Sequence, residues 1–294
     1  MQRASGFPDL LRAFHLALTV EGLRPATIEN YVGDVRHFAA WLGERDPRDV
    51  TTADLRAFLA EYAQGRRAKT VRETQIALKR FFRFLAEEGE VRRDPAQALR
   101  LMSYRVDPQP TYTQDEVETL LAACGTRTLE GVRDRALVRV LFDTGVREGE
   151  LLSMTLPDWE RGRAWVTGKT GPREVPLGMA ARQELERYLR RWRITETPLW
   201  RGKKGPLTES GVVQVVKRLC RKAGVPHKGV HAFRRAAAVQ MKRDGMQDSD
   251  LLEVFGWKTV VMLRRYTAAV AAELAREAHR RYSPGDSLGR IGRR

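Results

Sequence analysis

The sequence predicts a mainly α-helical protein of two domains, an N-terminal helical bundle and a mostly helical second domain containing a small antiparallel β-sheet. Three observations support this fold class. The chain has 294 residues, of which 42% are hydrophobic, enough for two domains that each bury a core. Apolar residues recur at helical spacing throughout the first hundred residues. A pair of short β-rich segments interrupts the helical pattern of the second half.

The first domain, residues 1–103, is expected to contain four short amphipathic helices joined by tight turns. Pro25 opens the second of them and Gly43 ends it, whereas Thr51 and Asp54 form a capping box before the third. The apolar faces consist of Leu10, Leu11, Phe14, Ala17 and Leu18; Ile28, Tyr31, Val35, Phe38, Trp41 and Leu42; Leu55, Phe58, Leu59 and Tyr62; and Val71, Leu78, Phe82 and Leu85, with Gly89 as the final stop.

Residues 104–111 are interpreted as a linker, because they lack periodicity and contain two prolines. The second domain then covers 112–294, and Thr113 with Glu116 forms its first capping box. Residues 163–167 and 173–177 are predicted strands around a hairpin turn at 168–171. Helices are expected to resume near Met179, after Thr208 and from Ala232 onward, and residues 283–294 to form a loose tail.

The charge of the chain points to a polyanionic partner. Its 53 Lys and Arg against 37 Asp and Glu give a formal net charge of +16, which favours nucleic acid above all. An anionic membrane is the other partner considered, but no stretch approaches the roughly 20 apolar residues of a spanning helix, and the N-terminus lacks the apolar run of a signal peptide. Cys124 and Cys220 are expected to be core residues rather than a disulfide.

The second domain contains candidates for phosphodiester chemistry. Cleaving such a bond needs cations for the non-bridging oxygens, an in-line nucleophile and an acid for the departing oxygen. Arg147 follows a turn glycine at the start of a short helix, a position that favours an anion, and Glu150 lies three residues later. His231 and Arg234 share one helical face, and Tyr266 follows Trp257 by nine residues. Each piece alone is more often an ordinary surface or core residue.

Taken together, these pieces resemble the tyrosine recombinase (phage integrase) family, in a Xer-like two-domain form. The family pattern is an Arg in a TGxRxxEL-like box, a Lys in a β-hairpin, an HxxR box, and a GH or GW box with Tyr about nine residues later. Here it is matched by Thr144–Leu151, Lys169, His231–Arg234, Gly256-Trp257 and Tyr266. The segment from Phe14 to Leu42 is similar to the family's SAM-like core-binding domain.

The resemblance implies a role for each matched residue. Arg147 and Arg234 would clamp the scissile phosphate, with Glu150 supporting the arginine box. His231 would hydrogen-bond the phosphate or act as general base toward Tyr266, the nucleophile, and Lys169 would protonate the leaving 5′ oxygen. The sequence departs from the pattern at Trp257, where most members have His, and at Arg235, where many have His. An indole N–H can donate one hydrogen bond but cannot relay a proton.

Composition gives Lys169 independent support. It is the only lysine between Lys79 and Lys203, in a stretch rich in arginine. Lysine can release a proton when its surroundings lower its pKa, whereas arginine holds its proton near neutral pH. The residue at the predicted turn therefore suits a proton donor, with a chance lysine in an exposed turn as the alternative.

Two other interpretations of the motifs, a P-loop and a metal site, do not hold. Gly168-Lys169-Thr170 is not a P-loop, because Gly162 is one residue too far upstream and a strand follows. His227 and His231 have metal-ligand spacing, but Pro226 and Gly229 break the helix, and no Glu or Cys completes the set. No metal, ATP or other cofactor is therefore expected.

The sequence predicts an enzyme that cleaves and rejoins double-stranded DNA at recombination sites through a 3′-phosphotyrosyl link, with two domains clamping the DNA. The resemblance implies a synaptic tetramer on DNA, with the helix after Tyr266, residues 269–281, docking on a neighbouring subunit. It also implies a cytoplasmic, nucleoid-associated protein of prokaryotic or mobile-element origin. The alternatives are a DNA-binding regulator without catalysis, disfavoured by the complete residue set, and a type IB topoisomerase, disfavoured by the first domain and the final helix.

Overall fold

The computed structural model describes residues 6–104, 109–169, 171–268 and 270–288. The chain divides into two compact units, residues 1–106 and 107–294. Of the predicted linker, residues 105–108 lie outside the described residues, as does Thr170 of the predicted hairpin turn. The linker limits of 104 and 111 stay a prediction.

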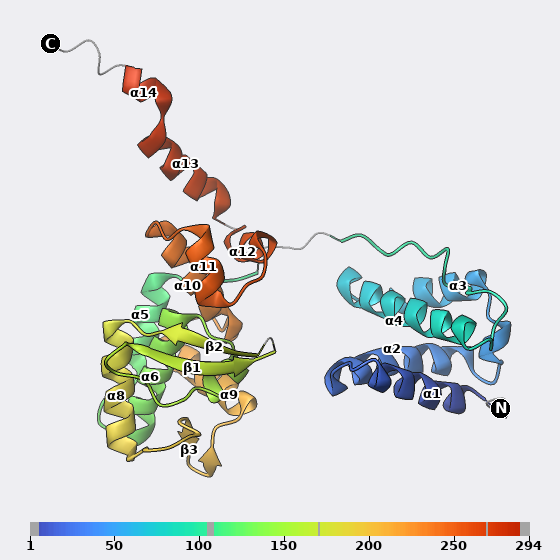
Figure 1. Cartoon of the computed structure of the whole chain (residues 1–294), viewed down its shortest axis with the longest axis horizontal. Coiled ribbons are helices and arrows are strands. Elements are labelled where there is room, and N and C mark those ends of the chain that lie inside the picture. The colour runs from blue at the N-terminus through green and yellow to red at the C-terminus, as the bar shows by residue number, and fades with distance from the viewer. Residues whose placement is uncertain (1–5, 105–108, 170, 269, 289–294) are drawn as a thin grey trace. The chain divides into compact units, whose positions relative to one another are not determined.

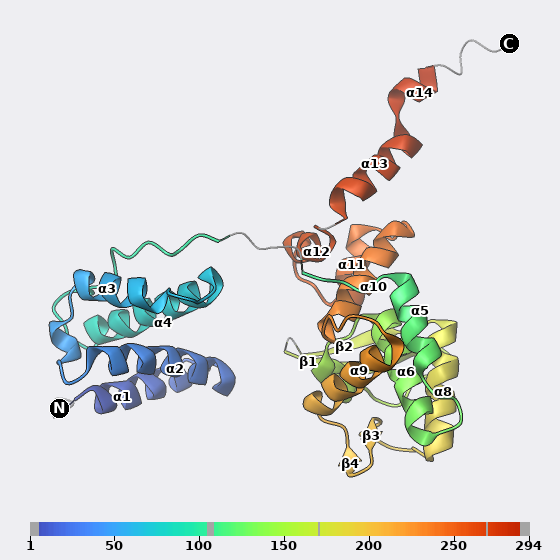
Figure 2. The same cartoon turned by 180° about the vertical axis from the view of Figure 1, so that it is seen from behind.

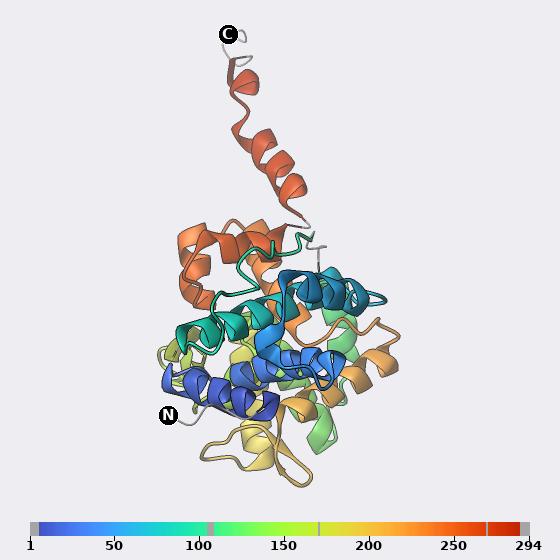
Figure 3. The same cartoon turned by 90° about the vertical axis from the view of Figure 1, so that its right-hand side faces the viewer.

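Unit 1 is the expected four-helix bundle, with one 3₁₀ turn, η1 (Pro47–Asp49) (Figures 1 and 3). Its core is aromatic: Phe38 packs edge-on against Phe58 and Phe82, with ring centroids 5.2 and 5.8 Å apart. The capping box of Thr51 and Asp54 is present. The helices are α1 (Phe7–Val20), α2 (Pro25–Leu42), α3 (Thr52–Tyr62) and α4 (Ala68–Glu87).

Unit 2 is built around α6 (Leu129–Thr144), which is buried on nearly every side. A helix in that position must be apolar all round or must pair its charges, and here buried Arg133 and Asp134 form an ion pair that Arg218 extends. The surrounding helices are α5 (Gln114–Ala123), α8 (Met179–Trp192), α9 (Glu209–Ala223) and α10 (His231–Arg243). Cys124 and Cys220 are both buried and unlinked, as expected.

The predicted hairpin is confirmed, with slightly longer strands than expected. β1 (Arg163–Gly168) pairs antiparallel with β2 (Gly171–Pro176), and Gly168 stands opposite Gly171. A second hairpin, β3 (Arg201–Gly202) with β4 (Gly205–Pro206), contradicts the expectation of a single interruption (Figure 2). Strands of two residues are too short to show the alternation that reveals a strand in sequence.

The C-terminal part of unit 2 consists of short helices. α11 (Asp248–Phe255) and α12 (Val260–Thr267) pack with α10 around a small apolar cluster that includes Leu251, Phe255 and Trp257. α13 (Ala271–Tyr282) buries none of its residues and extends away from the rest of the unit (Figure 2). Residues 284–288, predicted to belong to a loose tail, form the short helix α14 (Pro284–Leu288).

Candidate active site

Arg147 is placed by the end of one helix and the start of the next. Gly145 ends α6 with φ at +58°, the left-handed conformation that glycine adopts most easily. Two residues later Arg147 precedes α7 (Glu148–Leu152), and its backbone N–H donates to the Glu150 carboxylate at 2.8 Å. The guanidinium donates to the other Glu150 oxygen, also at 2.8 Å. The short helix therefore fixes both the backbone and the side chain of Arg147.

Glu150 is the anionic centre of the site, and its side chain is only 1% exposed. Besides Arg147, it accepts a hydrogen bond from Arg173 Nη2 at 3.0 Å, and Arg234 Nη1 lies 3.8 Å away. Burial alone would raise the pKa of this carboxyl, but the hydrogen bonds from Arg173 and from the Arg147 backbone outweigh it and lower the pKa to about 2. A single carboxylate thus holds three arginines in one place.

Arg234 is fully buried, because α10 carries it into the interior of the unit. Its terminal nitrogens donate to two carbonyl oxygens, that of Gly145 at 2.6 Å and that of Phe255 at 2.5 Å. Burial and the positive charge of Arg147 lower its pKa to about 10. Among the described residues its Nε has no hydrogen-bond partner, which leaves one buried donor for another acceptor.

Trp257 forms part of an aromatic stack that ends at Tyr266. Its ring lies 4.5 Å from that of Phe255 and 4.7 Å from that of Tyr266, and the Arg234 guanidinium lies 5.1 Å from its centroid. The ring therefore packs against the tyrosine. Its buried indole Nε1 also has no partner in the part of the chain that the structure describes.

His231 and Tyr266 meet across two helices. The Tyr266 hydroxyl, on α12, lies 2.8 Å from Nε2 of His231, the first residue of α10. The imidazole keeps some exposure to solvent, yet the surrounding protein and then the charges of Arg235, Arg234 and Arg147 lower its pKa to about 4. At neutral pH it is therefore uncharged and can accept the phenolic proton.

Lys169 lies at the hairpin turn and is exposed to solvent. The preceding residue, Gly168, passes so close to Glu150 that a Cβ there would lie 2.8 Å from the carboxylate. The β1–β2 hairpin therefore brings the backbone before Lys169 directly to the arginine cluster.

Arg173 is a site residue that the sequence reasoning missed. It projects from β2 on the same face as buried Val175, and besides Glu150 it donates to the carbonyl of Val254 at 2.7 Å. It thereby joins the hairpin to the end of α11, just before the aromatic stack. The alternation of the strand was the available signal. It places Arg173 on the same face as the apolar Val175, and an arginine on a buried face needs an anionic partner.

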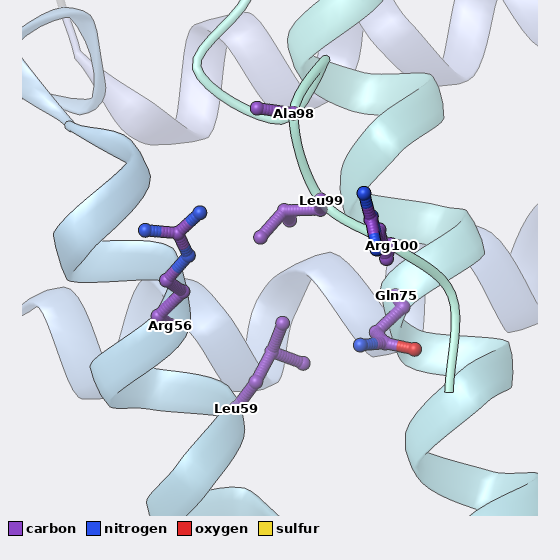
Figure 4. A pocket seen from close by; sticks show the side chains of 6 residues that line it. All are labelled: Arg56, Leu59, Gln75, Ala98, Leu99 and Arg100. Atoms are coloured by element: carbon purple, nitrogen blue, oxygen red, sulfur yellow. The ribbon is translucent and has the colours of Figure 1, made fainter. Parts of the chain in front are cut away.

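Other candidate sites do not gather comparable chemistry. In the described ranges, no three His, Cys, Asp or Glu side chains are placed to hold a metal ion. A shallow pocket of about 310 Å³ lies in unit 1, where Figure 4 shows Arg56 and Arg100 on either side of Leu59 and Leu99. It contains none of the predicted catalytic residues. No helix of the described chain is long and apolar enough to span a bilayer.

The structure is similar to solved recombinases. A lambda integrase dimer bound to a COC′ core site matches with a TM-score of 0.75 and 21% identity, covering 88% of this chain and 76% of that one. The XerH site-specific recombinase bound to a palindromic difH substrate matches with a TM-score of 0.71 and 19% identity, covering 92% and 84% of the two chains. These likenesses concern the fold.

Sequence comparison identifies the family. Residues 110–273 match the model of the phage integrase family, and residues 11–89 match the phage integrase N-terminal SAM-like domain. The tyrosine recombinase XerD of Listeria monocytogenes is 26% identical, covering 94% of this chain and 99% of its own length. The tyrosine recombinase XerC of Roseiflexus castenholzii is 31% identical, covering 86% of each. The resemblance seen in the motifs is thus confirmed, and the chain belongs to the phage integrase family of tyrosine recombinases.

Proposed function

We propose that this protein is a site-specific DNA recombinase that breaks and rejoins DNA strands through a 3′-phosphotyrosyl intermediate at Tyr266. The observation that carries the proposal is the 2.8 Å contact between the Tyr266 hydroxyl and His231 Nε2, beside the buried guanidinium of Arg234. A nucleophile, an uncharged base and a cationic cluster therefore occur together, which is what attack on a phosphodiester requires.

Attack by the tyrosine begins the reaction. As the Tyr266 oxygen bonds to phosphorus, its proton passes to His231, and the bond from phosphorus to the 5′ oxygen breaks. Lys169 gives that oxygen a proton, so a free 5′-hydroxyl leaves. Attack by the 5′-hydroxyl of a partner strand then releases the tyrosine and restores a phosphodiester. Each phosphodiester is exchanged rather than hydrolysed, so the energy of the bond is kept and no ATP is needed.

Arg147 and Arg234 stabilise the negative charge that grows on the non-bridging oxygens. Arg234 Nε and Trp257 Nε1 are buried donors without a partner among the described residues, and a bound phosphate oxygen would satisfy such donors. Glu150 fixes the arginines rather than touching the phosphate, since its oxygens already accept from Arg147 and Arg173. We assign Arg173 the same supporting role.

We further propose double-stranded recombination sites as the substrate and a tetramer as the active assembly. Lambda integrase has been solved as a tetramer bound to a Holliday junction, which supports the same arrangement here. The exposed helix α13 is our candidate for the contact between subunits. We assign DNA core binding to residues 1–103 and catalysis to 112–294, joined by a linker at 104–111. The protein would act in the cytoplasm, on DNA of the nucleoid.

Covalent trapping tests the nucleophile. On a nicked suicide substrate, Tyr266→Phe is expected to abolish the protein–DNA adduct while leaving DNA binding nearly intact, because only the attacking oxygen is removed. Tyr104→Phe, at an exposed tyrosine outside the second domain, is the matched control and should trap DNA normally. An adduct formed by Tyr266→Phe would show that the nucleophile is another residue.

The same substrates separate the remaining alternatives. Adduct formation by the wild-type chain would rule out a regulator without catalysis. Relaxation of supercoils without strand exchange between two sites would instead identify a topoisomerase.

A further inference from the structure

Arg235 joins the active-site helix to the segment that enters unit 2. Its Nε donates to the carbonyl oxygen of Pro110 at 2.8 Å. One residue further along the segment, the hydroxyl of Thr111 donates to the carbonyl of Ala232 at 3.3 Å. The chain is therefore attached to the first turn of α10, the turn that carries His231 and Arg234, immediately after the connection between the two units.

Lys228 strengthens the same attachment from the loop before α10. Its ammonium group donates to the Thr111 carbonyl at 3.0 Å and to both oxygens of Glu116 at 2.6 Å, while its backbone N–H donates to the Tyr112 hydroxyl at 3.1 Å. The Tyr112 ring packs on Phe233 at 4.6 Å. The entering segment, Pro110–Tyr112, is thus held at each of its three residues by the His231–Arg235 turn and its preceding loop.

Arg235 also stands beside the reacting groups. It follows His231 by four residues on a helix, so the two side chains share one face, a single turn apart. Its electrostatic interactions include both His231 and Tyr266. We propose that Arg235 is a positioning residue that couples the entering segment Pro110–Tyr112 to the His231–Tyr266 pair. The proposal rests on the proposed function, in which that pair carries out proton transfer.

The charges around His231 explain what the coupling achieves. His231 faces Arg234 and Arg235 of its own helix. It also faces Glu150 of α7, Arg147 directly before α7, and the Tyr266 hydroxyl of α12. Arg235 exerts the largest effect among the cations in lowering the pKa of His231. Because the bond to Pro110 fixes the position of this guanidinium, the entering segment helps to keep the imidazole uncharged over a wider range of pH.

Titration of His231 in the DNA-free protein tests the electrostatic half of the proposal without any catalysis. Arg235→Gln removes the charge and should raise the NMR titration midpoint of His231 by about half a unit or more, whereas Arg235→Lys keeps the charge and should leave it near the wild-type value. Arg190→Gln is the matched control, because it removes an exposed arginine of α8 whose ion pair among the described residues is with Glu186 of the same helix. An unchanged midpoint in Arg235→Gln would overturn the proposal.

The pH profile of DNA cleavage tests whether the effect of Arg235 on His231 changes the rate of the reaction. Below the His231 midpoint, Arg235→Gln should cleave a suicide substrate more slowly than wild type by the factor that its titration shift gives, about 3-fold for half a unit, and it should match wild type by pH 8, where both imidazoles are uncharged. Arg235→Lys should retain most of the wild-type cleavage rate both at acidic pH and at pH 8, and Arg190→Gln should retain all of it. A wild-type profile for Arg235→Gln, or an equal defect at every pH, would contradict the coupling.

The two experiments also distinguish this inference from the proposed function. If Tyr266→Phe still formed the adduct, the catalytic assignment would fail, yet the His231 titration would still report on Arg235. Conversely, suppose that Tyr266→Phe forms no adduct but Arg235→Gln leaves the His231 titration unaltered. Tyr266 would then remain the nucleophile, and only the role of Arg235 would be refuted.

Discussion

Lys169 and Arg147 are both cationic, but the proposed mechanism gives them different roles: Lys169 protonates the leaving oxygen, and Arg147 stabilises charge on the non-bridging oxygens. If Lys169 is the general acid, Lys169→Ala should cleave an ordinary phosphodiester about 10²- to 10⁴-fold more slowly. The same variant should recover on a substrate with sulfur in place of the 5′-bridging oxygen, because a thiolate leaves without a proton. Cleavage rates on the paired substrates provide the measurement.

Two further variants serve as controls for this experiment. Arg147→Ala should be impaired on both substrates, because its charge acts on the non-bridging oxygens. Lys169→Arg should stay impaired on the ordinary substrate, because a guanidinium releases its proton too reluctantly. Equal defects of Lys169→Ala on the two substrates would reduce Lys169 to a DNA-contacting residue of the hairpin.

Glu150 gives a prediction about stability. Glu150→Gln leaves the guanidinium groups of Arg147, Arg173 and Arg234 without their shared buried anion and should lower the free energy of unfolding by about 3–5 kcal/mol. Glu174→Gln, at an exposed carboxylate of β2 that pairs with Arg163, should cost about 1 kcal/mol or less. Denaturant unfolding at pH 7 measures both.

The pH dependence of the Glu150 contribution has a definite sign. The folded-state pKa of about 2 lies below the ordinary value of 4.5, so the native state holds the carboxylate charged more readily than the unfolded state does. The stabilisation is present above pH 4.5 and is lost as the pH falls toward 2. The stability difference between wild type and Glu150→Gln should therefore narrow over that range. A difference that grew on acidification would contradict the assigned pKa shift.

Individual site residues differed in how far the sequence could reveal them. The i, i+3 spacing of His231 and Arg234 indicated a shared helix, and the structure starts α10 at His231. Arg173 stayed hidden, because its partners Glu150 and Val254 lie 23 and 81 positions away in the chain. The contact of Tyr266 with His231 likewise depends on how α10, α11 and α12 pack, which local spacing does not encode.

At the level of secondary structure, the ends of helices position the site residues, and Gly145 at the end of α6 shows this most clearly. Its φ is +58°, and an added Cβ would lie 2.4 Å from Cε1 of Phe255. Gly145→Ala should therefore cost about 1–2 kcal/mol for the left-handed backbone and about 1–3 kcal/mol more for the clash. Gly224→Ala, at the end of α9, meets nothing within 4 Å at φ +67° and should show only the backbone cost.

Thermal unfolding of these two variants measures the difference. Gly145→Ala should also slow covalent trapping, because the Gly145 and Phe255 carbonyls both hold the Arg234 guanidinium. Equal stability losses for the two glycines would show that Phe255 moves aside without cost.

Elements with strong local signals were predictable, and those fixed by distant contacts were not. The capping boxes at Thr51 and Thr113 are both formed, because they satisfy helix N–H groups within four residues. The β3–β4 hairpin escaped prediction, since it is held largely from outside: the Tyr188 hydroxyl accepts the Arg201 N–H, and Arg133 donates to the Arg201 carbonyl.

For the molecule as a whole, the net charge of +16 predicts how binding responds to salt. Affinity for DNA should fall steeply as salt rises, because each neutralised phosphate releases counterions; six to ten such contacts would cost about 10³- to 10⁵-fold between roughly 50 and 200 mM salt. Fluorescence anisotropy across a salt series measures the slope. A flat series would mean that DNA is not the partner.

The contact between His231 and Tyr266 has a consequence for the order of events in an assembly. Both residues belong to one chain here, so a subunit of the proposed tetramer can bring the proposed nucleophile and its proton acceptor together without a neighbour. If strands are exchanged in turn rather than all at once, separating the Tyr266 hydroxyl from His231 would be one way to keep an idle subunit inactive.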